Sequence, residues 1–128
     1  MSSLSKLDLS NRIFTIRGCQ VMIDRDLADL YRVEVKRINE QVKRNIERFR
    51  EYFRFQLSEI ETTELVANCD RFRTLKHSYQ NPFAYTEQGV AMLSAVLRSE
   101  IAIQVSIQII NAFVEMRKIL LNHSGLIQ

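Results

Sequence analysis

The C-terminal segment constrains the fold more than any other part of the chain, because it predicts a long helix with a single polar stripe. Ser99 is a suitable N-cap residue, and the helix is expected to run from residue 100 to about residue 122. A helix that is apolar over most of its circumference is either central to a core or shared with a partner chain. We therefore expect a homodimer that forms through residues 101–121. The polar stripe consists of Gln104, Gln108, Asn111, Glu115, Lys118 and Asn122.

Length and composition indicate a single globular domain. The chain has 128 residues, of which 46% are hydrophobic and 26% are charged, a balance typical of a folded protein. The longest uncharged run, residues 101–114, is too short and too polar to cross a bilayer, so no membrane association is expected. Cys19 and Cys69 follow no recognisable pattern, which indicates reduced thiols and a cytoplasmic location.

Short strands and helices precede the long helix. Residues 13–17 and 20–23 are rich in β-branched and aromatic side chains, and Gly18-Cys19 between them suits a two-residue hairpin turn. Asp24 is expected to cap the helix that follows. These segments predict an α+β fold, in which a small antiparallel β element packs with helices.

The middle of the chain continues this pattern. Residues 53–57 and 82–85 are predicted strands, and a polar loop is expected over residues 70–81 between them. The capping-box sequence at Ser58 begins one further helix, and Thr86 caps another. For the domain boundaries, we expect a disordered lead-in at residues 1–11, one domain at residues 12–122 and a tail at residues 123–128.

Aromatic and basic residues alternate around the third predicted strand. Tyr52, Phe53 and Phe55 interleave with Arg50 and Arg54, a pattern that also occurs where bases of single-stranded nucleic acid stack on a protein. Strand alternation is the simpler interpretation, because it places Phe53 and Phe55 inward and Arg54 outward.

A helix predicted over residues 35–49 carries most of the positive charge. Residues 32–54 contain eight bases against four acids, an excess of four, whereas the whole chain has a net charge of +3. At about 100° per residue, the bases lie opposite a narrow apolar stripe. Such a local excess favours a polyanionic partner. The apolar stripe is Val35, Ile38, Val42, Ile46 and Phe49, and the opposite edge is Arg37, Gln41, Arg44 and Arg48.

Two interpretations of this basic edge are open. Surface helices often carry mixed charge simply as a solvated face. Alternatively, the short connection from the helix after Asp24 to the helix that begins near Val35 matches a helix-turn-helix, whose second helix enters the major groove of DNA. Arg32 stands where that motif usually has a glycine in its turn.

The sequence contains no pattern that predicts catalysis. His77 and His123 are not accompanied by the partners of a hydrolytic triad, and they lack zinc-ligand spacing with the two cysteines. A nuclease would require clustered carboxylates, and Asp24, Asp26 and Asp29 are explained by helix capping and solvent exposure. We expect no enzymatic activity, no bound metal and no cofactor.

Three blocks of sequence carry a family resemblance. They are IFTIRGCQVMIDRDLADLYRVEVKRINEQVKRN, FRFQLSEIE and PFAYTEQGVAMLSAVLRSEIAIQVSIQIINAF, in this order within residues 12–118. Over these blocks the chain closely resembles the KilA-N-related "ORF-six N-terminal" domain of phages and bacterial mobile elements. That family is regarded as a DNA-binding domain, often at the N-terminus of phage antirepressor or regulatory proteins. The resemblance implies a DNA-binding role for the basic helix at residues 35–49.

The sequence therefore predicts sequence-specific or structure-selective binding of double-stranded DNA, by a phage or mobile-element transcriptional regulator or antirepressor-type protein. The alternative is a protein–protein interaction module that acts through the apolar last helix. The predicted groove-facing residues are Arg37, Gln41 and Arg44; the predicted phosphate contacts are Lys36, Lys43 and Arg48, and a wing that contains Arg71, Arg73 and Lys76.

Overall fold

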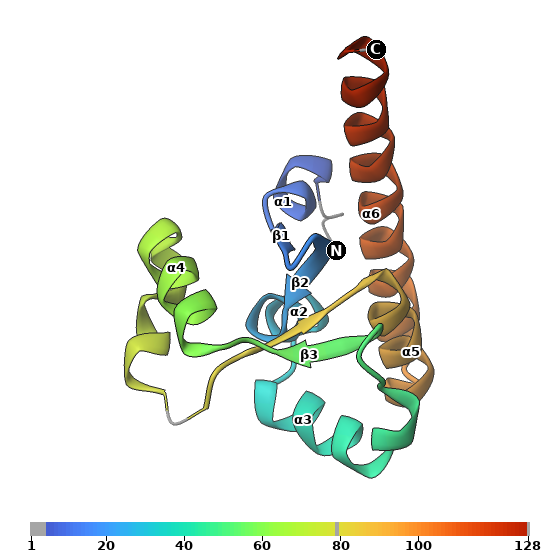
Figure 1. The fold of residues 1–128 in the computed structure, drawn as a ribbon. Helices are drawn as coiled ribbons and strands as arrows, with labels where there is room; N and C mark the ends of the chain where they lie inside the picture. The colour runs from blue at the N-terminus through green and yellow to red at the C-terminus, as the bar shows by residue number, and fades with distance from the viewer. Residues whose placement is uncertain (1–4, 79, 128) are drawn as a thin grey trace.

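Residues 5–78 and 80–127 are described by the structure, which is a computed structural model. Helices surround a small antiparallel sheet (Figure 1), which confirms the predicted α+β fold with a long C-terminal helix. Within the described residues the strand order is β1-β2-β4-β3. The strands are β1 (Ile13–Ile16), β2 (Cys19–Ile23), β3 (Arg54–Gln56) and β4 (Phe83–Tyr85). The α-helices are α1 (Lys6–Ser10), α2 (Asp24–Tyr31), α3 (Val35–Arg44), α4 (Glu59–Asn68), α5 (Glu87–Leu97) and α6 (Glu100–Ile127), and the 3-10 helices are η1 (Ile46–Arg48) and η2 (Asp70–His77).

The sheet separates two hydrophobic cores. Side chains alternate along β2, so that Met22 packs into the larger core with α2, α3, α5 and α6, whereas Val21 and Ile23 pack with α4 and η2 on the other face. All three side chains are fully buried. Figure 1 shows α4 to the left of the strands and α5 and α6 to the right. The larger core therefore holds α3 and α6 on the same side of the sheet.

Helix α6 contributes one side to the larger core and leaves another side free. Ala102, Ile109 and Phe113 are buried in that core. Tyr31 of α2 and Ser106 of α6 share a buried hydrogen bond of 2.7 Å between their hydroxyl oxygens, and burial raises the pKa of Tyr31 to about 12. Figure 1 shows that α6 continues well beyond the sheet. Helix α6 is thus a core helix. This agrees with the first of the two interpretations of its sequence, in which the helix is central to a core.

Three predicted helix starts are confirmed. Ser58 accepts a hydrogen bond from the backbone N–H of Glu61, whose side chain accepts one from the N–H of Ser58, so the capping box is complete. Thr86 and Ser99 each accept a hydrogen bond from the backbone N–H three residues further on, over 3.2 Å and 3.0 Å respectively. These signals are local, which is why the sequence locates them correctly.

The hairpin turn lies one residue earlier than predicted. Ile16 pairs with Cys19, so the turn consists of Arg17 and Gly18, with φ values of 55° and 73°. Positive φ at both positions is the geometry of a type I′ turn, and it follows the twist of the flanking strands. The side chain of Arg17 donates to Glu61 of α4, and this hydrogen bond lowers the pKa of Glu61 to about 2.

Both ends of the predicted domain contain helical segments. Residues 1–11 were expected to be a disordered lead-in, but the described part contains α1, whose Leu9 is only 4% exposed in the larger core. At the other end, α6 continues through most of the expected tail at residues 123–128. Residues 1–4 and Gln128 lie outside the described residues.

Two local predictions between these ends were wrong. The expected loop at residues 70–81 contains η2, because Phe72 and Leu75 turn inward and are buried in the smaller core. Asp24 is the first residue of α2 and does not cap it. Its carboxylate instead accepts a hydrogen bond of 3.2 Å from the backbone N–H of Phe83 in β4, so it joins a helix to a strand.

Candidate nucleic-acid interface

Helices α2 and α3 pack together across a three-residue turn. Arg32 ends α2 in the left-handed conformation, with φ of 60° and ψ of 46°. Glycine adopts this conformation most easily. The backbone geometry therefore explains why a helix-turn-helix usually has a glycine at the position that Arg32 occupies here. Beyond the turn, Ile38 and Val42 of α3 are fully buried in the larger core. The inner face of α3 therefore holds the helix in a fixed position.

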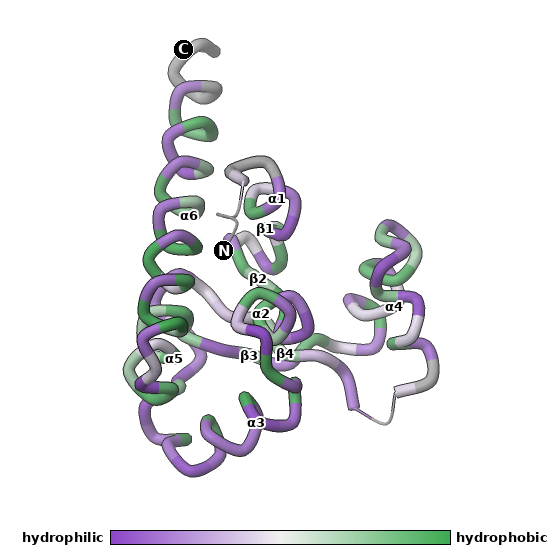
Figure 2. Tube along the Cα trace, turned by 180° about the vertical axis from the view of Figure 1, so that it is seen from behind, coloured by the Kyte–Doolittle hydropathy of each residue, from purple (hydrophilic) through white to green (hydrophobic). Residues whose placement is uncertain are grey.

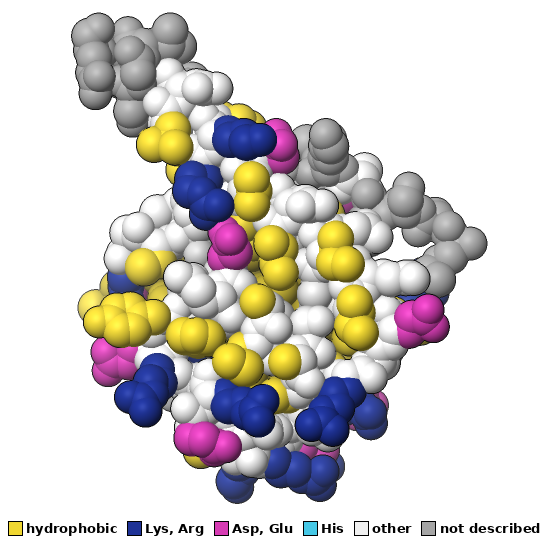
Figure 3. Space-filling view, turned by 90° about the vertical axis from the view of Figure 1, so that its right-hand side faces the viewer, with side chains coloured by type: hydrophobic (Ala, Val, Ile, Leu, Met, Phe, Trp, Pro, Cys, Tyr) yellow, Lys and Arg dark blue, Asp and Glu magenta, His cyan; other side chains and the backbone are white. Residues whose placement is uncertain are grey.

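The outer face of α3 carries cations that have no partner. Lys36, Arg37, Lys43 and Arg44 are exposed, and none of them forms a side-chain hydrogen bond or an ion pair with another described residue. By contrast, four ion pairs elsewhere join arginines to carboxylates over 2.7–2.9 Å. Figure 3 shows Lys and Arg side chains gathered along the end of the molecule at which α3 lies in Figure 1. Unpaired cations on one rigid face produce a positive field there.

The cations of α3 lie in two rows with one acidic residue between them. At about 100° per residue, Lys36 and Lys43 fall on one side of Glu40, and Arg37 and Arg44 fall on the other. Glu40 is exposed and, in the described part of the chain, has no ion pair. The face is therefore positive at its two edges. At its centre it carries the negatively charged carboxylate of Glu40, which accepts hydrogen bonds.

The basic helix is shorter than predicted. It ends at Arg44, and η1 follows as a 3-10 turn that carries the exposed Arg48. Gln41, predicted to face the groove, is half-buried. Phe49 is buried as expected, whereas Ile46 is 52% exposed because it has left the helical stripe. Arg44 thus lies on the exposed face, and Gln41 lies only partly on it.

Two of the bases predicted on the wing are exposed. Arg73 has a side chain 76% exposed and lies 3.6 Å from the carboxylate of Asp70, and Lys76 is exposed without an ion pair among the described residues. Figures 1 and 2 show α4 and the chain after it to one side of the strands, with α6 on the other side. Both bases are thus exposed to solvent on the side of the sheet that carries α4 and η2.

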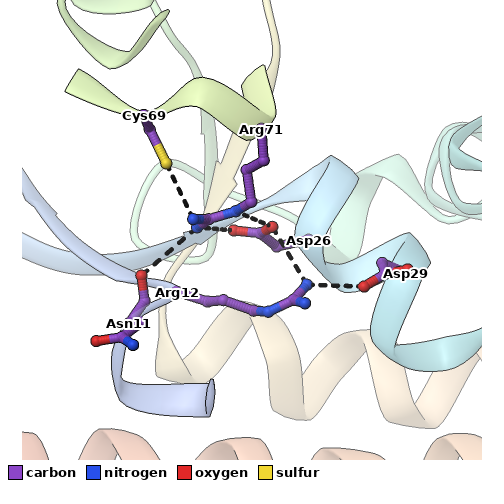
Figure 4. Close-up of polar contacts among 6 residues, drawn as sticks. All are labelled: Asn11, Arg12, Asp26, Asp29, Cys69 and Arg71. Carbon is purple, nitrogen blue, oxygen red and sulfur yellow. Dashed lines mark hydrogen bonds and ion pairs between the residues drawn. The ribbon is translucent and has the colours of Figure 1, made fainter. Parts of the chain in front are cut away.

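The third base of the predicted wing, Arg71, is paired with a buried carboxylate (Figure 4). Arg71 donates from Nε and Nη2 to the two carboxylate oxygens of Asp26, each over 2.9 Å, and this pairing raises the pKa of Arg71. Arg12 approaches the same carboxylate at 3.3 Å and also pairs with Asp29 at 2.9 Å. The network joins η2, α2 and the start of β1. The sequence did not indicate this pairing of Arg71.

A groove with a volume of about 590 Å³ lies beside α3. Its walls include Lys36, Asn39 and Lys43 from α3 and Arg54 and Phe83 from β3 and β4. Arg54 was expected to point outward into solvent, but it is half-buried, with its Cζ 3.5 Å from the centre of the Phe83 ring. No local signal predicts this contact, because it depends on how β3 pairs with β4.

The described residues offer no cluster of three His, Cys, Asp or Glu side chains that could hold a metal ion. No helix in the described ranges combines the length and the apolar character that a membrane span requires. Anion binding by cations and hydrogen-bond donors is the chemistry that the exposed face of α3 can supply.

A comparison with known families agrees with the resemblance found in the sequence. A family model described as the ORF6N domain matches residues 11–96 and so includes α2, α3 and all of β1 to β4. No curated protein and no solved structure matches the chain significantly. Since the family match covers 86 of the 128 residues, the chain belongs to the ORF6N domain family, a KilA-N-related family of phages and mobile elements.

Proposed function

We propose that this protein binds double-stranded DNA through α3, and that it acts as a phage or mobile-element transcriptional regulator or antirepressor-type protein. Family membership supports a phage-type regulatory or DNA-related role. The observation that carries the proposal is the set of unpaired cations on the outer face of α3, whose inner face is fixed in the core. Cations that neutralise phosphates release condensed counterions, and this release drives association with DNA.

The two rows of cations suggest how α3 meets a duplex. An α-helix fits the major groove, where arginine can donate two hydrogen bonds to guanine. Arg37 and Arg44 lie two helical turns apart on one side and are suited to base edges or to the phosphates beside them. Lys36 and Lys43, on the other side, are suited to phosphates of the opposite groove wall. Arg48, Arg73 and Lys76 add further phosphate contacts around this end of the molecule.

A homodimer through α6 is the second part of the proposal. Ile103 and Ile107 are 47% and 55% exposed, and Ile110 and Val114 follow on the same side at spacings of three and four. This alternation is that of a helix–helix seam. Figure 3 shows the hydrophobic side chains gathered above the basic edge. Two-fold dimers of helix-turn-helix proteins read two half-sites, so this contact fits the proposed DNA binding.

The proposal is tested by the fluorescence anisotropy of a labelled duplex at two salt concentrations. We expect binding that weakens steeply as salt rises, because the contacts are with phosphates. We also expect supercoiled DNA to stay intact in Mg²⁺ or Mn²⁺, since we propose binding without catalysis. If the protein fails to bind any duplex at low salt, the exposed side of α6 favours the other function, that of a protein-interaction module.

A further inference from the structure

The groove between α3 and the β3–β4 end of the sheet has the features of a phosphate site. Lys36 and Lys43 line it from the helix, and Arg54 lines it from β3. Three cations and a single carboxylate, Glu40, surround this one space. Like charges that converge on a groove repel one another unless an anion lies between them. A polyanion relieves this repulsion better than solvent does, because its charges are fixed at the groove.

Arg54 is oriented before any ligand arrives. Its guanidinium lies over the Phe83 ring, 3.5 Å from the ring centre, and its Nε donates to the Tyr85 hydroxyl over 3.2 Å. In the described structure, neither Nη atom of Arg54 has a hydrogen bond or an ion pair. A planar guanidinium that is stacked on one face keeps its fork of donors free for the two oxygens of a phosphate. Little side-chain freedom remains to be lost on binding.

The aromatic support of Arg54 is itself fixed by the sheet. Arg54 pairs with Tyr85 and Gln56 pairs with Phe83, so Arg54 and Phe83 are diagonal neighbours across the two strands. The backbone N–H of Phe83 donates to the buried carboxylate of Asp24 over 3.2 Å. Phe83 is therefore a positioning residue for Arg54, held by strand pairing and by α2.

We infer that this groove binds the phosphodiester backbone of one DNA strand, with Arg54 as the anchoring cation. The inference rests on the proposed function, because it places the strand beside the helix that enters the major groove. Lys36 and Lys43 then face the same stretch of backbone as Arg54. The contact fixes the register of α3 on the duplex without reading its sequence.

The experiment compares Arg54→Met with the unmodified protein on a selected and a scrambled duplex at several salt concentrations. Methionine keeps an apolar stem over Phe83 and removes the charge. Affinity is expected to fall about 5-fold to 10-fold on both duplexes, and the slope of log affinity against log salt to fall by about one unit. Lys118→Met, on the polar stripe of α6, is the matched control and should bind as the unmodified protein does.

A second readout follows single phosphates of the duplex and begins with the unmodified protein. In a duplex with one methylphosphonate, a single phosphate is neutral. We expect the unmodified protein to lose affinity at one or two such positions beside the α3 site, and Phe83→Leu, which keeps Arg54, to lose part of this discrimination. Arg54→Met should no longer distinguish these positions from a fully charged duplex. Equal binding of every methylphosphonate duplex by the unmodified protein would contradict the inference.

The remaining outcomes separate the groove from the proposed function. Duplex binding by the unmodified protein, combined with an unchanged affinity and salt slope in Arg54→Met, overturns the groove and leaves the role of α3 intact. Failure of the unmodified protein to bind duplex overturns both. Inorganic phosphate at constant ionic strength should not raise the melting temperature. A saturable rise that Arg54→Met abolishes would identify a site for free phosphate and overturn the assignment to DNA.

Discussion

Arg71 of η2 and Asp26 of α2 are joined by two hydrogen bonds of 2.9 Å, from Nε and Nη2 of the guanidinium to the two oxygens of the carboxylate. The Asp26 side chain is only 3% exposed, so Arg71 neutralises a charge that has almost no access to water. The pair connects the smaller core to the helix that precedes α3. The charge of Arg71 is therefore compensated within the fold.

Arg71→Ala is expected to lower the free energy of unfolding by about 2–3 kcal/mol, because Asp26 would keep only the longer contact with Arg12. Urea denaturation measures this change. Arg73→Ala is the control: Arg73 is an exposed neighbour on the same element, and its loss should change stability by less than about 0.5 kcal/mol. Equal stability of the two variants would show that the Arg71–Asp26 pair does not support the fold.

Arg37→Ala or Arg44→Ala should weaken binding to a preferred duplex by about 1–3 kcal/mol. Either change should also reduce the difference in affinity between the preferred duplex and random DNA. Both side chains are exposed, so folding should survive. Arg73→Ala or Lys76→Ala should instead weaken all sequences alike, with about one unit less salt slope for each lost phosphate contact. Fluorescence anisotropy against selected and scrambled duplexes separates these cases. Unchanged affinity in the Arg37 and Arg44 variants would mean that α3 has a solvated face only.

Arg32→Gly is expected to move stability and binding in opposite directions. Arg32 has a φ of 60°, which costs a residue with a side chain about 1 kcal/mol relative to glycine. Glycine should therefore raise the free energy of unfolding by about this amount. The same change removes an exposed cation in the turn before α3 and should reduce duplex affinity. A thermal melt and a binding curve on one sample test both effects, and a stabilised variant with full affinity would exclude Arg32 from the interface.

Ile103→Glu combined with Ile107→Glu should convert a dimer to a monomer without unfolding it. Both side chains are about half exposed, so a carboxylate at either place stays in water. Light scattering at tens of micromolar gives the mass, and circular dichroism gives the helix content. Ile110→Glu provides the contrast, because Ile110 is half-buried against the larger core and its replacement should also destabilise the fold. A monomeric mass for the unmodified protein would show that α6 is a core helix only.

Asp24→Asn should stabilise the protein near neutral pH. Asp24 is 3% exposed, and burial raises its pKa from 3.8 to about 6. The pKa of Asp24 is higher in the folded state than in the unfolded state. The protonated carboxyl therefore contributes fully to the stability of the fold below about pH 4, and this contribution is lost as the pH rises through 6. Asparagine keeps an acceptor for Phe83 and carries no charge, so it should add up to about 3 kcal/mol above pH 7 and little near pH 4. Urea denaturation at both pH values tests this, and an equal effect at the two would contradict it.

The sequence predicts features that depend on a few neighbouring residues. The capping residues Ser58, Thr86 and Ser99 were located correctly because each serves the backbone N–H three residues ahead. The hairpin turn was displaced by one residue because Gly18 suits the first position of one turn type and the second position of another. Only the pairing of Ile16 with Cys19 decides between them.

The sequence does not predict features that join distant segments. Arg71 and Asp26 are 45 residues apart. Nothing in the sequence distinguishes Arg71 from Arg73, because only the tertiary structure brings Arg71 to Asp26. Likewise, the stack of Arg54 on Phe83 exists only once β3 and β4 are paired. Of the candidate site, the exposed bases of α3 followed from helical periodicity, whereas the groove beside them required the tertiary structure.

The order of the strands determines when this domain can fold during its synthesis. Strand β4 lies between β2 and β3, yet the ribosome makes it after both. The β1–β2 hairpin is local and can form early, but β3 has no neighbouring strand until residues 83–85 have left the exit tunnel. Until then, the edges of β2 and β3 that pair with β4 have no strand beside them. The nascent chain therefore completes its sheet in one late step, when β4 closes the gap.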